Sequence, residues 1–390
     1  MSRRFKILLL FFLASVIFLF VFYRENHVDI EDYAERVYQV CSDSKEIEKC
    51  YDKELSDLMD KVSMEEVFEV TRIVQMRDKN YPYCHVLGHK LAAIETKKDP
   101  TKWKEVISRC PAGVCSNGCV HGAFQEKYRM DVDSFTDFDV IVSELADVCK
   151  GRVGWSPSGL EQASCFHALG HLLMYVSKAD ILLATKTCDK IAKDAEFDYT
   201  SVCYDGAFMQ IYQPLEQEDR ELIVGKEITR DNVESFCKDF RDIKKESCVI
   251  ESWPLYIKEI TSPKSVGVLC DQLNGDSREN CYRDVFYIIP IQFHFDWKLM
   301  VSYCGGFDVG RQEVCALTMA SRIMEMNYES YDKAVEFCEK FEENVSTSCL
   351  KGLVSYANFS LVNRSEIYDN FCKLMLAKHG LVCEDSFKKL

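Results

Sequence analysis

The chain has 390 residues and a formal net charge of −15, from 48 Lys and Arg against 63 Asp and Glu. A surface that binds nucleic acid needs clustered cations to displace the counterions of phosphates. No long basic run occurs beyond the first few residues, so we expect no nucleic-acid partner. The length allows two or three ordinary domains, or one extended repeat array.

An almost wholly apolar segment occupies residues 7–23, just after three cations. In a helix its seventeen residues reach roughly 25 Å, the short end of a membrane span. The preceding cations predict a cytoplasmic N-terminus. A cleaved signal peptide is the alternative, but the segment lacks a small-residue cleavage site. We therefore predict a cytoplasmic tail (1–4), a transmembrane signal-anchor (5–23) and a linker (24–30). The body would then be extracellular, periplasmic or lumenal.

Twenty cysteines, an even number, indicate an oxidising compartment. Five C-x10-C pairs begin at positions 237, 270, 304, 338 and 372, which are 33, 34, 34 and 34 residues apart. A period of this length without Pro- or Gly-rich punctuation fits a repeated helix–turn–helix unit. It is similar to the period of tetratricopeptide-type arrays. The signature residues of those arrays do not occur here, so the resemblance concerns architecture alone.

In each repeat we expect the first cysteine to close one helix and the second to open the next, so that a local disulfide joins them. Cys110, Cys115 and Cys119, with His121 just beyond, also have the composition of a zinc knuckle. Three thiolates on zinc would leave an odd number of cysteines, whereas pairing Cys110 with Cys119 leaves Cys115 for Cys84. The ten predicted disulfides are Cys41–Cys50, Cys84–Cys115, Cys110–Cys119, Cys149–Cys165, Cys188–Cys203, Cys237–Cys248, Cys270–Cys281, Cys304–Cys315, Cys338–Cys349 and Cys372–Cys383.

The predicted fold is all-α, with disulfide-stapled helical-hairpin repeats after one N-terminal transmembrane helix. The repeats would form an α-solenoid or a curled α/α array. Residues 31–214 form a histidine-containing repeat region, and residues 215–390 form the regular C-x10-C region.

Five of the eight histidines fall at the predicted starts of three consecutive returning helices, and these are His85, His89, His121, His167 and His171. Two HxxGH segments place two imidazoles four residues apart on one helix face, the spacing at which two histidines share a metal ion. The positive end of a helix dipole favours neutral imidazole at a helix start. Asp205 occupies the position of the first histidine in the next segment, so it aligns with His85, His121 and His167.

A shared site demands a curled array. In a flat stack His85 and His167 would lie roughly 18–20 Å apart, so the first turns of these helices must converge. Imidazole donors suit zinc, copper or iron, and this is the cofactor we expect. Structural histidines of a repeated core, and acid–base chemistry without a metal, are the alternatives.

Three functions fit these features. The first is a membrane-anchored extracytoplasmic binding or scaffold protein, with a histidine metal site and a protein partner on the repeat surface. The second is a metal-dependent hydrolase or oxidase in a curled α/α domain, with Asp205 or Glu126 as the base. The third is a purely structural interaction array.

Overall fold

The computed structural model describes residues 30–383, except for 82–83, 112–113, 130–137, 146, 194–196, 215–216 and 362. The predicted signal-anchor lies outside the described residues. Within them, no helix has the length and apolarity that a membrane crossing requires. The described chain is all-helical, as predicted, and its only β-type pairing is an isolated bridge between Arg152 and Trp155.

The chain divides into two compact units, residues 1–78 and 79–390. In the first unit α2 packs against α4, and the Cys41–Cys50 disulfide joins α2 to α3. A buried hydrogen bond from the Tyr51 hydroxyl to Asp78, 2.7 Å long, ties α3 to the residue after α4. The helices of this unit are α2 (Ile30–Cys41), α3 (Ile47–Asp57), η1 (Leu58–Asp60) and α4 (Met64–Arg77).

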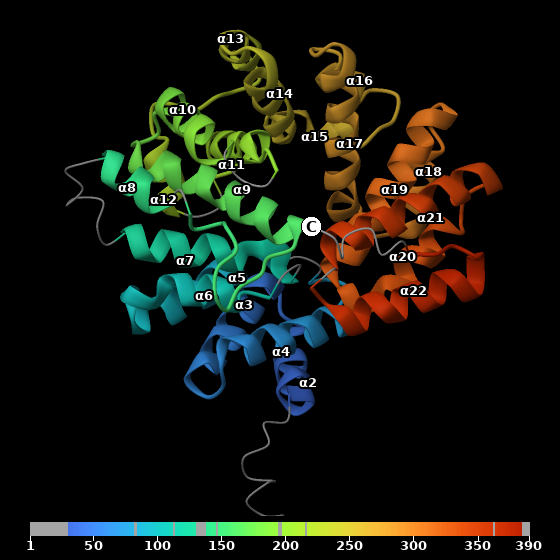
Figure 1. The fold of residues 1–390 in the computed structure, drawn as a ribbon, viewed down its shortest axis with the longest axis horizontal. Helices are drawn as coiled ribbons and strands as arrows, with labels where there is room; N and C mark the ends of the chain where they lie inside the picture. The colour runs from blue at the N-terminus through green and yellow to red at the C-terminus, as the bar shows by residue number, and fades with distance from the viewer. Residues whose placement is uncertain are drawn as a thin grey trace, which may run out of the picture. The chain divides into compact units, whose positions relative to one another are not determined.

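The second unit is a succession of helical hairpins (Figure 1). Eight helices form one row, and all of them except the last contribute residues to the lining of a cavity. They are α5 (His85–Lys98), α7 (Gly118–Arg129), α9 (Gly159–Val176), α11 (Thr200–Tyr212), α14 (Asp242–Glu251), α17 (Gly275–Gln292), α19 (Val309–Met326) and α21 (Glu343–Ser360). The remaining helices are mostly shorter: η2 (Pro100–Lys102), α6 (Trp103–Arg109), η3 (Val114–Asn117), α8 (Phe138–Leu145), α10 (Ile181–Ile191), α12 (Gln217–Leu222), α13 (Val233–Lys238), η4 (Trp253–Tyr256), α15 (Ile257–Ile260), α16 (Gly267–Cys270), α18 (Trp297–Cys304), η5 (Tyr328–Ser330), α20 (Tyr331–Cys338) and α22 (Ser365–His379).

All ten predicted disulfides are formed, which confirms the local pairing. Among the four hairpins from α13 to α21, the second cysteine does not open its helix as predicted. Cys248, Cys281, Cys315 and Cys349 are each the seventh residue of their helix. Helix α19 begins earlier because the Asp308 side chain caps it, whereas α14, α17 and α21 begin without a side-chain cap.

The last C-x10-C pair departs from the hairpin rule. Helix α22 continues through Cys372 to His379 and ends at Gly380, whose φ of 68° is the left-handed conformation that favours glycine. Cys383 lies beyond the end of α22, at the last described residue. The disulfide here staples a helix to the chain that directly follows it.

The row of helices in the second unit closes on itself. Helix α21 packs against α9, and α19 packs against η3. The Phe359 ring fills the space beside Gly159, where a Cβ would lie 2.1 Å from a ring carbon. The side-chain amide of Asn363 donates a hydrogen bond to the Ser156 carbonyl oxygen. The repeats therefore enclose an interior, which an open stack would lack.

Candidate metal centre and cavity

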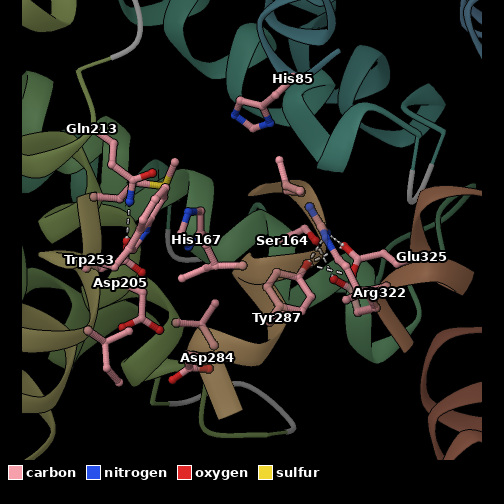
Figure 2. A pocket seen from close by; sticks show the side chains of 18 of the residues that line it. His85, Ser164, His167, Asp205, Gln213, Trp253, Asp284, Tyr287, Arg322 and Glu325 are labelled. Atoms are coloured by element: carbon pink, nitrogen blue, oxygen red, sulfur yellow. Dashed lines mark hydrogen bonds and ion pairs between the residues drawn. The ribbon is translucent and has the colours of Figure 1, made fainter. Parts of the chain in front are cut away.

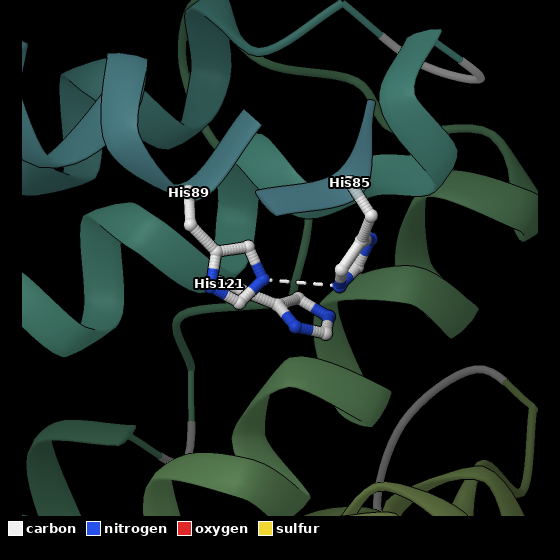
Figure 3. A group of neighbouring side chains, drawn as sticks. All are labelled: His85, His89 and His121. Carbon is white, nitrogen blue, oxygen red and sulfur yellow. Dashed lines mark hydrogen bonds between the residues drawn. The ribbon is translucent and has the colours of Figure 1, made fainter. Parts of the chain in front are cut away.

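Helices α5 and α7 pack backbone against backbone because glycines line their contact. A Cβ on Gly122 would lie 2.0 Å from the carbonyl oxygen of His89, and one on Gly118 would lie 2.2 Å from that of His85. No side chain fits at either place, so the helices approach more closely than ordinary side chains allow. His121 precedes Gly122, and its ring centroid lies 4.9 Å from that of His85 and 5.0 Å from that of His89 (Figure 3).

The same contact recurs between α9 and α11. A Cβ on Gly206 would lie 1.9 Å from the His167 carbonyl oxygen, and one on Gly170 would lie 2.1 Å from a carbonyl oxygen of α11. The second HxxGH segment, with His167 and His171, therefore also lies where glycines let two helices pack closely. The two helix pairs share this glycine packing but differ in register, because Gly122 meets the second histidine of its HxxGH segment and Gly206 meets the first. Asp205 stands where α7 has His121.

The five imidazoles converge on His121. Its ring centroid lies 5.7 Å from that of His167 and 4.8 Å from that of His171, so it stands between the two HxxGH pairs. Among the described residues, the possible ligand atoms form two groups, each within 4.8 Å: His85, His89 and His121, and His121, His167 and His171. Because the helices pack through glycines and the array curls, the separation of His85 and His167 that a flat stack would impose does not arise. Either group has the composition and spacing to hold a metal ion.

Hydrogen bonds at Nδ1 orient the first pair of rings. His85 Nδ1 donates to the Cys115 carbonyl oxygen at 3.3 Å, and His89 Nδ1 donates to the side-chain oxygen of Gln125 at 3.1 Å. Cys115 adopts a positive φ of 53° and is tied to Cys84, the residue before His85, by a disulfide. Partners of this kind fix the tautomer of a metal-ligating histidine and leave Nε2 free.

The second pair of rings has equivalent partners. His171 Nδ1 donates to the side-chain oxygen of Gln210 at 2.7 Å, and His167 hydrogen bonds to the backbone of Val202. Gln210 directly follows Met209, which lines the cavity.

Within each pair the two Nε2 atoms face each other. They are 3.0 Å apart in His85 and His89, and 3.3 Å apart in His167 and His171. Two nitrogens bound tetrahedrally to zinc at about 2.0–2.1 Å lie roughly 3.3 Å apart. The pairs therefore have nearly the separation that a shared metal ion requires.

Burial keeps the imidazoles of His85, His121, His167 and His171 neutral. It lowers the pKa of His85 and His121 well below the usual range, and neighbouring histidines lower both further. Burial also lowers the pKa of His167 to about 3 and that of His171 to about 4. Neutral imidazole is the form that binds a metal.

The predicted contribution of the helix dipole is wrong for the second pair. Helix α9 starts at Gly159, where Ser158 and Glu161 form a capping box, so His167 lies in its interior. The S-x-x-E signature is visible in the sequence and could have located this start. Desolvation, and not a helix N-terminus, holds His167 neutral.

An interior cavity of about 490 Å³ adjoins the histidines. His85, His121 and His167 line it, while His89 and His171 are not among its lining residues. Figure 2 shows His85 and His167 at the cavity. No protein-family model, curated protein or solved structure matches this chain. Its function is therefore inferred from the cluster and the cavity themselves.

Three partly buried carboxyl groups line the same cavity, and these are Asp205, Glu251 and Asp284. Burial raises the pKa of Asp205 to about 8 and that of Asp284 to about 7, and it raises the pKa of Glu251 well above the usual range. These groups can hold a proton near neutral pH, as a general acid or base must. Glu126, the other candidate base, is buried on α7 but is not among the cavity-lining residues.

A buried ion pair completes the lining. Arg322 and Glu325 are 3% and 2% exposed and pair at 2.9 Å. The Tyr287 hydroxyl donates to Glu325 at 2.7 Å, and the Arg322 guanidinium lies over the Tyr287 ring (Figure 2). Sequence analysis missed these residues because Arg and Glu three positions apart on a helix resemble an exposed surface pair.

Proposed function

We propose that this chain is an extracytoplasmic metalloenzyme that hydrolyses a small polar molecule within its interior cavity, with a membrane anchor at its N-terminus. The ten disulfides indicate the oxidising environment. The single observation that carries the proposal is a group of three histidines whose possible ligand atoms lie within 4.8 Å of one another, beside a cavity that is also lined by ionisable carboxyl groups.

The donor set supports a catalytic ion over a structural one. Structural zinc sites are closed by four protein ligands, whereas catalytic sites have three and leave a position open. Here each group offers three histidine ligands to an ion, and His85, His121 and His167 border the cavity. Disulfides already staple the hairpins, so folding has no evident need of a metal.

The cavity supports a small substrate. Its volume of about 490 Å³ falls within the roughly 300–1,000 Å³ of small-molecule sites. Zinc is the metal we propose first, because it binds imidazole and brings the pKa of a bound water near neutrality. Asp205, whose pKa is raised to about 8 by burial, is proposed as the acid or base that exchanges a proton with the substrate.

The test uses the full chain produced in an oxidising compartment. We expect stoichiometric zinc by elemental analysis, and hydrolysis of 4-nitrophenyl acetate or 4-nitrophenyl phosphate that a chelator abolishes and zinc restores. His167→Ala should lower the metal content and abolish turnover. Asp205→Asn should keep the metal but lose about 10²–10⁴-fold in rate.

His294→Asn is the matched control. His294 is exposed, outside the cluster, and has a φ of 48° that asparagine tolerates. It should leave metal content and turnover unchanged. Stoichiometric copper with oxidase activity would favour the oxidase alternative, and metal without turnover would favour the binding or scaffold function. Absence of bound metal would refute the proposal.

A further inference from the structure

We infer that His121 bridges two metal ions as an imidazolate, one ion held by His85 and His89 and the other by His167 and His171. This inference rests on the proposed metal function and makes its centre dinuclear. Each ring nitrogen of His121 would donate a lone pair to one ion, and the proton of the neutral ring would leave to solvent.

The first supporting observation is the grouping of ligand atoms. The described residues form two groups of three, and not one group of five. His121 is the only member common to both groups. A single ion bound by one group would leave the Nε2 pair of the other unused.

The second observation is the duplication of the support. Each HxxGH pair has its own glycine contact and its own hydrogen-bond partners, and its Nε2 atoms are 3.0 or 3.3 Å apart. His85 must carry its proton on Nδ1, because the Cys115 carbonyl only accepts, so its Nε2 presents a lone pair. Both pairs are thus built to chelate an ion, yet only one further histidine is present for the two of them.

The third observation concerns His121 itself. Its side chain is buried, and its Nδ1 has no hydrogen-bond partner among the described residues. The other four rings all have a partner from the protein. A buried nitrogen without a partner is costly unless something else binds it. A metal ion on each side would satisfy both nitrogens of this ring.

The proposed centre differs from hydrolase sites in which two ions share an oxygen at about 3.5–4 Å. Across an imidazole ring, with metal–nitrogen bonds of about 2.0 Å, the ions would lie roughly 6 Å apart. Two paramagnetic ions joined in this way should couple magnetically through the ring. This coupling gives a readout that is independent of enzymatic activity.

The test begins with the metal-free full chain, titrated with Zn²⁺ and separately with Cu²⁺. We expect two equivalents of each per chain. With Cu²⁺, electron paramagnetic resonance should show that the isolated-ion signal is largely lost as the second equivalent binds. Saturation at one equivalent would overturn the inference of a bridge. Binding of two Cu²⁺ ions that both keep the full isolated-ion resonance signal would overturn it as well. Failure to bind any metal would instead refute the proposed function.

Two variants separate the bridge from independent sites. His121→Ala should lower the affinity for both ions at least tenfold and abolish the magnetic coupling. Added imidazole should restore the coupling by occupying the vacated space. His89→Ala should lose one equivalent and keep the other. Wild-type binding and coupling in His121→Ala would overturn the inference. The wild-type titration alone tests it if a variant fails to fold.

Discussion

Gly122→Ala tests whether the approach of α5 and α7 creates the metal centre. The added Cβ would lie 2.0 Å from the His89 carbonyl oxygen and 2.6 Å from its Cα. These are backbone atoms, so no rotamer change relieves the clash. The two helices must separate where His121 faces His85 and His89.

The size of the displacement follows from contact distances. Non-bonded carbon contacts need about 3.5 Å, so the helices must move apart by more than about 1 Å. Metal sites tolerate ligand displacements of about 0.2 Å. We therefore expect metal affinity to fall at least tenfold, as it does when the supporting shell of a metal site is disrupted. Overpacking should also lower the free energy of unfolding by about 1–3 kcal/mol.

The assay is Zn²⁺ titration of the metal-free chain, followed by denaturant unfolding without metal. Gly310→Ala is the matched control, because its Cβ would meet only an Asp308 oxygen at 3.5 Å. It lies in the first turn of α19 and should leave the affinity unchanged, with a stability gain of up to about 1 kcal/mol. Wild-type zinc affinity in Gly122→Ala would refute the close-packing explanation of the site.

Three further predictions concern the carboxyl groups, one disulfide and the anchor. Burial raises the folded-state pKa of Asp284 to about 7, so its contribution to stability is full below about pH 4 and is lost as the pH rises through 7. The rise from 3.8 to about 7 corresponds to about 4 kcal/mol. Asp284→Asn should therefore gain up to about 4 kcal/mol over the parent at pH 8 but only about 1 kcal/mol at pH 4.5, measured by denaturant unfolding. Equal effects at both pH values would contradict this. Replacing Cys84 and Cys115 by serine opens a disulfide loop with a sequence separation of 31, which should lower the free energy of unfolding by about 3–4 kcal/mol. Zinc binding should also weaken. Unaltered zinc binding would show that this disulfide does not support His85. Protease added outside intact cells should digest the body and spare residues 7–23 if the anchor and its orientation are as proposed. Protection of the body would show that the orientation is the reverse of the one proposed.

The sequence alone was sufficient to predict the all-helical fold and the pairing of the cysteines. Disulfide partners across a short hairpin are local, so spacing and parity identify them. Even the irregular Cys84–Cys115 link followed from parity. Helix boundaries were predicted less well, because a cap such as Ser158 begins α9 well before the cysteine that marked its start.

The five histidines could be selected from the sequence, since HxxGH places two imidazoles on one helix face. Their convergence could not be predicted, because helix packing at ordinary distances separates them by many ångströms. The glycine contacts that bring the helices together, such as Gly122 on His89, depend on how α5 and α7 meet in three dimensions.

The remaining residues of the cavity were decided only by closure of the second unit. Arg322, Glu325 and Asp284 belong to repeats far along the chain from the histidines, and their local sequence resembles a solvated helix face. Arg322 and Glu325 become buried, and Asp284 partly buried, because α19 and α21 return to pack against η3 and α9. Local spacing therefore determines which cysteines pair and which imidazoles share a helix face, while long-range packing decides which charged groups lose water and share a cavity with them.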